Sequence, residues 1–193
     1  MDDPVDDDPR RVPDLLGPDL RLLLVGINPS LLSAETGLHF ARPGNRFYPA
    51  LRRAGILPAD VLTPADAALV LPTRGVGITN LVPRPTARAD QLRPDEVRDG
   101  RERVAALVRR HRPRVVAVAG ITSYRVAFDD RRATPGRQPH DLEGAELWVV
   151  PNPSGLNAHA TIESLARDYR EVAEAAGLDL FAEGERQDRA QGN

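Results

Sequence analysis

The sequence predicts an α/β fold, a three-layer sandwich whose short, mainly parallel central sheet is flanked by helices. Four short apolar runs alternate along the chain with segments of helical periodicity. Strands and helices in alternation are typical of a parallel sheet that is covered on both faces. The length of 193 residues suits one domain with its own core, since domains commonly run to about 100–150 residues.

The first apolar run is LRLLLVGI, residues 20–27, which ends in Asn-Pro as a buried strand does when it meets a loop. A loop rich in glycine and proline follows, and the next expected helix covers residues 45–54. The second expected strand is VGITNLV, residues 76–82. It leads into VPRPTARAD, residues 82–90, where little helical or strand pattern is present and a loop is expected.

Residues 94–111 are expected to form a surface helix, because Pro94 stands at a first-turn position and acidic residues follow it. Its apolar side chains share one face: Val97, Val104, Leu107 and Val108. The rest of the chain continues the alternation, with a strand at 114–120, a short helix at 121–128, a strand at 146–152 and a helix at 161–176.

Both ends of the chain are predicted to be solvated tails around one domain, residues 10–178. Residues 1–9 hold five aspartates, and residues 179–193 are polar without apolar periodicity. The whole chain has a formal net charge of −2, but residues 9–178 hold 24 of the 26 basic and 19 of the 28 acidic residues, a net charge of +5. This excess favours a polyanionic partner.

The composition excludes several kinds of chemistry. The chain has no cysteine, which excludes disulfides, thiolate nucleophiles and cysteine metal sites. It has no lysine either, so a lysine Schiff base and a GxxxxGK phosphate loop are both impossible. The four histidines are scattered, and we expect no metal and no cofactor. No apolar run approaches the roughly 20 residues of a membrane span, so we expect a cytoplasmic, nucleoid-associated monomer.

Two loops at predicted strand ends are nearly identical: GINPSLL, residues 26–32, and PNPSGLN, residues 151–157. In parallel sheets, sites form in the loops beyond the carboxyl ends of the strands, so these loops are expected to converge on one ligand. The polar candidates at the strand ends are Asn28, Ser30, Asn80, Asp90, Asn152, Ser154, Asn157 and His159.

These side chains suggest a reaction that needs little acid–base help. A carboxamide is not a strong base, but it can hold a water in line with an electrophile, which suffices when the reaction passes through a cation-like sugar. Phe40, which follows His39 in a Gly/Pro loop, can offer an aromatic face to a base, and backbone N–H groups beside Ile27 and Phe40 can bond its carbonyls. The parts fit base excision better than phosphoryl transfer.

Each candidate also has an ordinary structural interpretation. Asn28 before a proline suits a turn, Phe40 suits the core, Asn157 suits a helix cap, and Arg84 and Arg88 suit a solvated rim. These interpretations do not explain why the unusual residues gather at one end of the sheet, and we therefore favour a functional site.

Three segments carry a resemblance to a known family: GINPSLLSAETGLHFARPGNRF (26–47), GITNLVPRPTA (77–87) and PNPSGLN (151–157). In their residues, order and spacing they are similar to the mismatch-specific uracil and thymine DNA glycosylases of the uracil-DNA glycosylase superfamily. The likeness covers roughly residues 18–176 and implies that superfamily's α/β fold.

The resemblance implies a role for individual positions. Asn28 would position the hydrolytic water. Ile27 and Phe40 would contact the flipped base through their backbones, and the Phe40 ring would stack on it. The loop around Gly155 and Leu156 would enter the helix and touch the guanine opposite the lesion, with Asn157 and His159 beside it.

The chain departs from the family pattern at three positions. Ser30 stands where a glycine is frequent, and Ala158 stands where an arginine is often found after PNPSGL, which bears on recognition of the guanine. Asn80 replaces a lysine, which removes a charge near the pocket and bears on base selectivity. Asp90 lies just beyond the 82–90 loop and is a second candidate for activating the water, if that loop folds over the pocket.

We therefore expect a monofunctional DNA glycosylase of base excision repair that flips uracil from mismatched duplex DNA, chiefly G·U, and hydrolyses the N-glycosidic bond; thymine and other damaged bases are further candidates. The alternative is a damage- or mismatch-binding protein on the same scaffold with little turnover. A nucleotide-binding protein is disfavoured because the chain has no GxGxxG turn. The residues expected on the DNA backbone are Ser154, Arg42, Arg46, Arg84 and Arg88.

Overall fold

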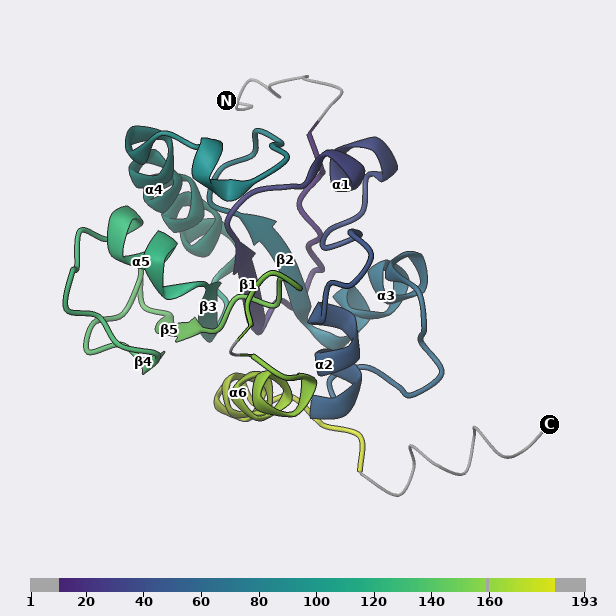
Figure 1. The fold of residues 1–193 in the computed structure, drawn as a ribbon. Helices are drawn as coiled ribbons and strands as arrows, with labels where there is room; N and C mark the ends of the chain where they lie inside the picture. Colours follow the sequence, from purple (N-terminus) through teal and green to yellow (C-terminus); the bar gives the residue numbers. More distant parts are fainter. Residues whose placement is uncertain (1–10, 159, 183–193) are drawn as a thin grey trace.

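A computed structural model describes residues 11–158 and 160–182 of the chain. Its centre is a five-stranded sheet (Figure 1). The strands are β1 (Leu22–Gly26), β2 (Val76–Asn80), β3 (Val115–Ala119), β4 (Gly136–Arg137) and β5 (Glu146–Val150). Their order is β2-β1-β3-β5-β4, and every pair is parallel except β4 with β5. The expected mainly parallel sheet is confirmed.

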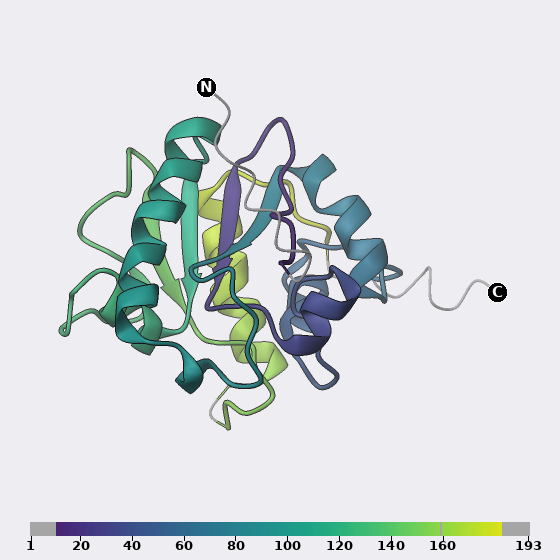
Figure 2. The ribbon, with the colours of Figure 1, turned by 90° about the horizontal axis from the view of Figure 1, so that it is seen from above.

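Two layers of helices cover the sheet (Figures 1 and 2). Alternate residues of a strand point to opposite faces, so Leu22 and Leu24 of β1 pack in one apolar cluster, while Leu23 and Val25 pack in another. The first cluster includes buried residues of α2 (Phe47–Ala54), α3 (Pro64–Val70) and α6 (Ile162–Ala175), and the second includes those of α4 (Pro94–His111) and α5 (Ile121–Ala127).

Helix α4 has the expected bounds, and the other expected elements lie close to the observed ones, which are shorter at one or both ends. The α2 helix begins at Phe47 rather than residue 45, because the Asn45 side chain accepts a hydrogen bond from the Phe47 N–H (2.9 Å) and closes a turn before the helix. The α6 helix begins after Thr161, whose side chain accepts from the Ser164 N–H and caps it.

Two helices lie in segments that the sequence analysis leaves without regular structure. The α1 helix (Leu31–Thr36) lies inside the opening glycine- and proline-rich loop. Ser30 caps its N-terminus by accepting from the Ser33 N–H (3.1 Å), and Gly37 ends it with a left-handed φ of 70°. The α3 helix is capped by Thr63 in the same way. Helices of six and seven residues are too short to show a clear periodicity.

The expected N-terminal tail, residues 1–9, and residues 183–193 of the expected C-terminal tail lie outside the described residues. Residues 179–181, which the sequence analysis assigns to the C-terminal tail, pack on the domain. The Phe181 N–H donates to the Gly55 carbonyl (2.9 Å), and the Arg74 guanidinium lies over the Phe181 ring at 4.2 Å. The packed part of the chain therefore extends a few residues beyond the expected boundary.

Candidate active site

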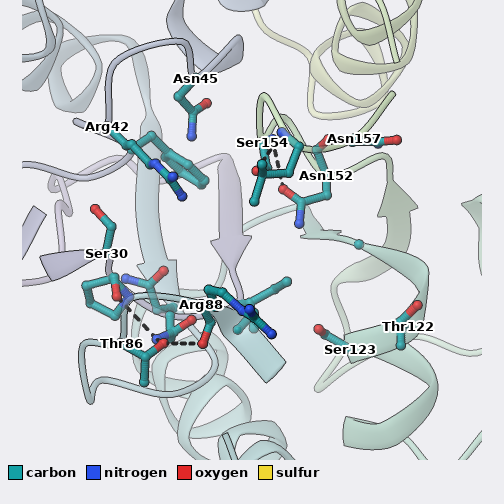
Figure 3. A pocket seen from close by; sticks show the side chains of 18 of the residues that line it. Ser30, Arg42, Asn45, Thr86, Arg88, Thr122, Ser123, Asn152, Ser154 and Asn157 are labelled. Carbon is teal, nitrogen blue, oxygen red and sulfur yellow. Dashed lines mark hydrogen bonds between the residues drawn. The ribbon is translucent and has the colours of Figure 1, made fainter. Parts of the chain in front are cut away.

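A cavity of about 650 Å³ opens at the edge of the sheet where β1, β2, β3 and β5 end (Figure 3). Both Asn-Pro loops reach it, through Asn28 and Ser30 of the first loop and through Asn152 and Ser154 of the second. The loop after β2 also folds along the cavity, from Thr86 onward. The two similar loops therefore meet at one site, as expected from their positions in the sequence.

The Asn28 carboxamide has one possible orientation. Its nitrogen donates to the carbonyls of Pro29 (3.2 Å) and Arg84 (3.0 Å) and to the Thr86 hydroxyl (2.7 Å). The Thr86 hydroxyl donates its own proton to the Arg88 carbonyl (2.8 Å), so toward Asn28 it can only accept a hydrogen bond (Figure 3). The nitrogen of Asn28 is thus held on three acceptors, and its oxygen is the atom left to accept a hydrogen bond from a water.

Phe40 presents an aromatic face at the cavity. One face of its ring stacks on Phe47, with centroids 3.9 Å apart and planes 20° from parallel. Its φ is 52°, a left-handed conformation that is uncommon outside glycine. The Tyr48 hydroxyl donates to the His39 carbonyl (2.7 Å), and the Ala41 N–H donates to the Ser33 hydroxyl (3.3 Å), so both neighbours of Phe40 are fixed. The ring is therefore pre-positioned.

The buried His39 orients Asn80. Its Nε2 lies 2.9 Å from the Pro13 carbonyl, which can only accept, so Nε2 carries the proton. Burial lowers the pKa of His39, so the ring is neutral near pH 7 and Nδ1 accepts from the Asn80 nitrogen (3.3 Å). The Asn80 oxygen then lies beside Gly26, where an added Cβ would stand 2.5 Å from it. Asn80 lines the cavity, and its side-chain oxygen is left to accept a hydrogen bond.

Asp90 lines the cavity, but its carboxylate forms an ion pair with Arg88. Both of its carboxylate oxygens accept from the Arg88 guanidinium, one of them from Nε at 3.1 Å. The hydrogen bonds from Arg88 lower the pKa of Asp90, and its side chain is 59% exposed. A carboxylate with a lowered pKa is a weaker base, so the geometry favours an ion pair at the cavity rim over water activation.

Three of the four arginines expected on DNA make internal contacts. Arg84 pairs with Glu96 through Nε (2.7 Å) and Nη2 (2.8 Å). Arg88 pairs with Asp90, and the Arg46 guanidinium turns inward to backbone carbonyls. Among the described residues, Arg42 alone of the four shows no ion pair or side-chain hydrogen bond, and it is exposed at the cavity. The partners of Arg84 and Arg46 could not be anticipated from the sequence because they lie 12 to 111 residues away.

The 152–157 loop forms the rim next to Arg42 and Asn45 (Figure 3). The Asn152 oxygen accepts from the Ser154 N–H (3.0 Å), and the Asn157 side chain donates to the Asn152 carbonyl (3.0 Å). These bonds make a compact turn that leaves Leu156 73% exposed. His159 lies outside the described residues. Asn157 thus braces the turn instead of capping α6, where Thr161 is the cap.

Several cavity residues were not among the sequence candidates. Thr86 is buried and sets the direction of Asn28. It lies in the 77–87 segment that carries the resemblance, but no role for it was predicted. Thr122 and Ser123 line the cavity from the first turn of α5 and face Thr86 across the opening (Figure 3). Small polar residues directly after a strand end could have indicated them. In the described part of the chain, no group of three His, Asp or Glu residues could hold a metal ion.

The fold and the cavity define an α/β protein with a candidate ligand site beyond the carboxyl ends of parallel strands. A model of the Uracil DNA glycosylase superfamily matches residues 13–174, and the chain therefore belongs to this superfamily. Membership implies glycosylase activity, the hydrolysis of N-glycosyl bonds, with DNA as the substrate. No helix in residues 11–158 or 160–182 is long and apolar enough to cross a membrane.

A solved structure has a similar fold. It is the solution NMR structure of a candidate uracil DNA glycosylase from Methanosarcina acetivorans, which matches with a TM-score of 0.60. The match covers 84% of this chain and 97% of that chain at 18% sequence identity. The likeness confirms the expected three-layer α/β sandwich.

Proposed function

We propose that the protein is a monofunctional, mismatch-specific uracil-DNA glycosylase of base excision repair, acting as a cytoplasmic monomer on duplex DNA. The observation that carries the proposal is the fixed carboxamide of Asn28. Its nitrogen is bound to three acceptors, so its oxygen is available to a water in the cavity that also presents the Phe40 ring.

The proposed reaction begins when the uracil leaves the base stack and lies on the exposed face of Phe40. The Asn80 oxygen accepts from the N3–H group of the base, while backbone N–H groups near Ile27 and Phe40 donate to its carbonyls. The bond from C1′ to N1 breaks, the base departs with the electron pair, and the water held by Asn28 adds its oxygen to C1′. One proton of the water stays on the new C1′ hydroxyl group, and the other passes to solvent.

The absence of lysine supports monofunctional activity. Strand cleavage by a lysine imine cannot occur in a chain without lysine. The product is an abasic site in an uncut strand, and treatment with borohydride should trap no covalent adduct.

Selectivity for mismatches rests on the cost of extracting the base. A mispaired uracil is easier to flip than a paired one, by up to a few kcal/mol. The exposed Leu156 stands at the cavity rim, where it can fill the space that the base vacates and contact the opposite guanine. Thymine carries a methyl group that the cavity wall must accommodate, so release of thymine should be slower. Arg42 is the arginine best placed for a DNA phosphate.

The alternative is a protein that binds damaged or mismatched DNA with little turnover. The Asn28 geometry favours hydrolysis, because a binding protein has no need of a carboxamide whose two amide protons are held by three nearby acceptors so that its oxygen can receive a water.

The test is single-turnover conversion of labelled oligonucleotides to alkali-sensitive abasic sites. Four substrates are compared: G·U, A·U and G·T duplexes and single-stranded DNA with one uracil. We expect G·U to react fastest, A·U more slowly by about tenfold or more, and G·T more slowly than G·U. Duplex binding without base release would favour the binding protein, and equal rates on G·U and A·U would contradict mismatch selectivity.

A further inference from the structure

Arg46, which was expected on DNA, is directed into the protein. One guanidinium nitrogen, Nη2, donates to the carbonyls of Ser154 and Asn157, both at 2.7 Å. Its Nε is buried and has no hydrogen-bond partner. The Arg46 backbone N–H donates to the Pro153 carbonyl (3.0 Å). A side chain placed in this way cannot reach a phosphate without abandoning the 152–157 loop.

The neighbours of Arg46 contact the same loop and also the base pocket, the part of the cavity formed by Phe40 and Asn80. Gly155 packs so closely on the Gly44 carbonyl that an added Cβ would stand 2.8 Å from its oxygen. On the other side of Arg46, Phe47 stacks beneath the Phe40 ring at 3.9 Å. Residues 44–47 therefore touch both the loop that bears Leu156 and the residue beneath the aromatic face.

The 152–157 loop lacks regular structure of its own, so its shape depends on such contacts. Charged donors make the stronger hydrogen bonds to carbonyls. Removal of a charged donor leaves its acceptors without a hydrogen bond and allows the loop to sample other conformations. The loop then loses this conformational entropy when DNA binds, which weakens binding.

We propose that Arg46 is a positioning residue that holds the 152–157 loop in its binding conformation and so places Leu156 at a fixed distance from the base pocket. The loop meets the helix only in a duplex, so the effect of Arg46 on excision is specific to double-stranded substrates. This consequence rests on the proposed glycosylase function, whereas the effect on the loop itself does not.

The first experiment measures amide hydrogen exchange by mass spectrometry in the wild type and in Arg46→Gln. Asn157 is the reporter, since its N–H donates to the Ser154 carbonyl (2.9 Å) within the loop. We expect exchange in the 153–158 peptide to rise about tenfold, with β3 unchanged. Arg46→Lys, which keeps a charged donor, should restore part of the protection.

The matched control is Arg52→Gln. Arg52 lies in α2, the helix that Arg46 precedes, and also donates to a backbone carbonyl, that of Val61 (3.0 Å), away from the loop. Its loss should leave exchange in 153–158 unchanged. Unchanged exchange in Arg46→Gln would overturn the proposal. A rise that includes β3 would do the same, because Arg46 would then support the whole fold.

The second experiment compares single-turnover uracil release from G·U duplex and from single-stranded DNA. Arg46→Gln should lower the ratio of duplex to single-strand rates about tenfold, and Arg52→Gln should leave it unchanged. An equal fall on both substrates would contradict the duplex-specific role. A wild type that releases no uracil from either would refute the proposed function instead, and the exchange measurement would still decide the role of Arg46.

Discussion

At the scale of single residues, two carboxamide groups are oriented by partners that can only accept a hydrogen bond from the amide nitrogen. The Thr86 hydroxyl can only accept from Asn28, because its proton is used on the Arg88 carbonyl. The neutral His39 ring, protonated on Nε2, can only accept from Asn80. In both cases the carboxamide oxygen is the group left for a water or a base. An asparagine in a freely rotating environment would offer donor and acceptor equally.

The state of His39 gives a prediction about pH. Burial lowers the pKa of His39 below its ordinary value of about 6.5, against smaller opposing effects of the Pro13 carbonyl and Asp14, while Arg103 lowers it further. Below about pH 6.5 the unfolded chain binds a proton at this residue that the folded protein does not. Stability from a neutral His39 is therefore complete above pH 6.5 and is lost as the pH falls toward the folded-state pKa.

We expect acidification from about pH 7.5 to pH 5.5 to lower the free energy of unfolding more in the wild type than in His39→Gln. Urea unfolding of both proteins at the two pH values measures the difference. The other three histidines are common to both proteins, so the comparison isolates His39. The same loss of stability in both proteins would mean that His39 does not titrate as its burial implies.

At the scale of elements, the position of the Phe40 ring depends on contacts with α1, α2 and β1. Helix α1 supplies Ser33 and helix α2 supplies Tyr48, which fix the backbone on either side of Phe40. Strand β1 ends in Gly26, where an added Cβ would lie 3.1 Å from the Phe40 ring and 2.5 Å from the Asn80 oxygen. A side chain at Gly26 would displace the two groups proposed to hold the base.

Gly26→Ala should therefore reduce uracil release from G·U by more than tenfold, with a loss of stability of about 1–3 kcal/mol from overpacking. Gly17→Ala is the matched control: its Cβ would stand 2.4 Å from the Pro72 oxygen, away from the cavity. It should lose stability while the folded enzyme keeps its single-turnover rate. Full activity in Gly26→Ala would show that the Phe40 and Asn80 positions do not govern base binding.

The elements also show how far the sequence could predict this structure. Four of the five strands, β1, β2, β3 and β5, were predictable because each is a five-residue, mainly apolar segment, whereas the two-residue β4 gave no pattern and was not predicted. Helix α4 was predictable because Pro94, the first-turn acids and the apolar face agree. Helix α1 was missed because its signals, Ser30 and Gly37, also suit turns. Asn28 and Phe40 were predictable at the site through family motifs. Thr86 and the inward direction of Arg46 were not, because both depend on contacts between distant segments.

At the scale of the whole molecule, the parallel sheet gathers the site. Four strands end at one edge, so residues as far apart in the chain as Asn28, Asn80, Gly120 and Asn152 line one cavity. The exposed Leu156 stands at the same edge. The base pocket and the loop that would meet the duplex are therefore neighbours, and the remaining helices serve mainly to bury the sheet on which both are built.

The most direct test of the account is single-turnover uracil release from a G·U duplex by Asn28→Ala, with Asp90→Asn beside it and duplex affinity measured for each protein. The account predicts that Asn28→Ala binds the duplex but releases uracil at least about 10²-fold more slowly than the wild type, while Asp90→Asn stays within about twofold of it. Release by Asn28→Ala at the wild-type rate, or a steep fall in Asp90→Asn alone, would contradict the assignment of the water to Asn28.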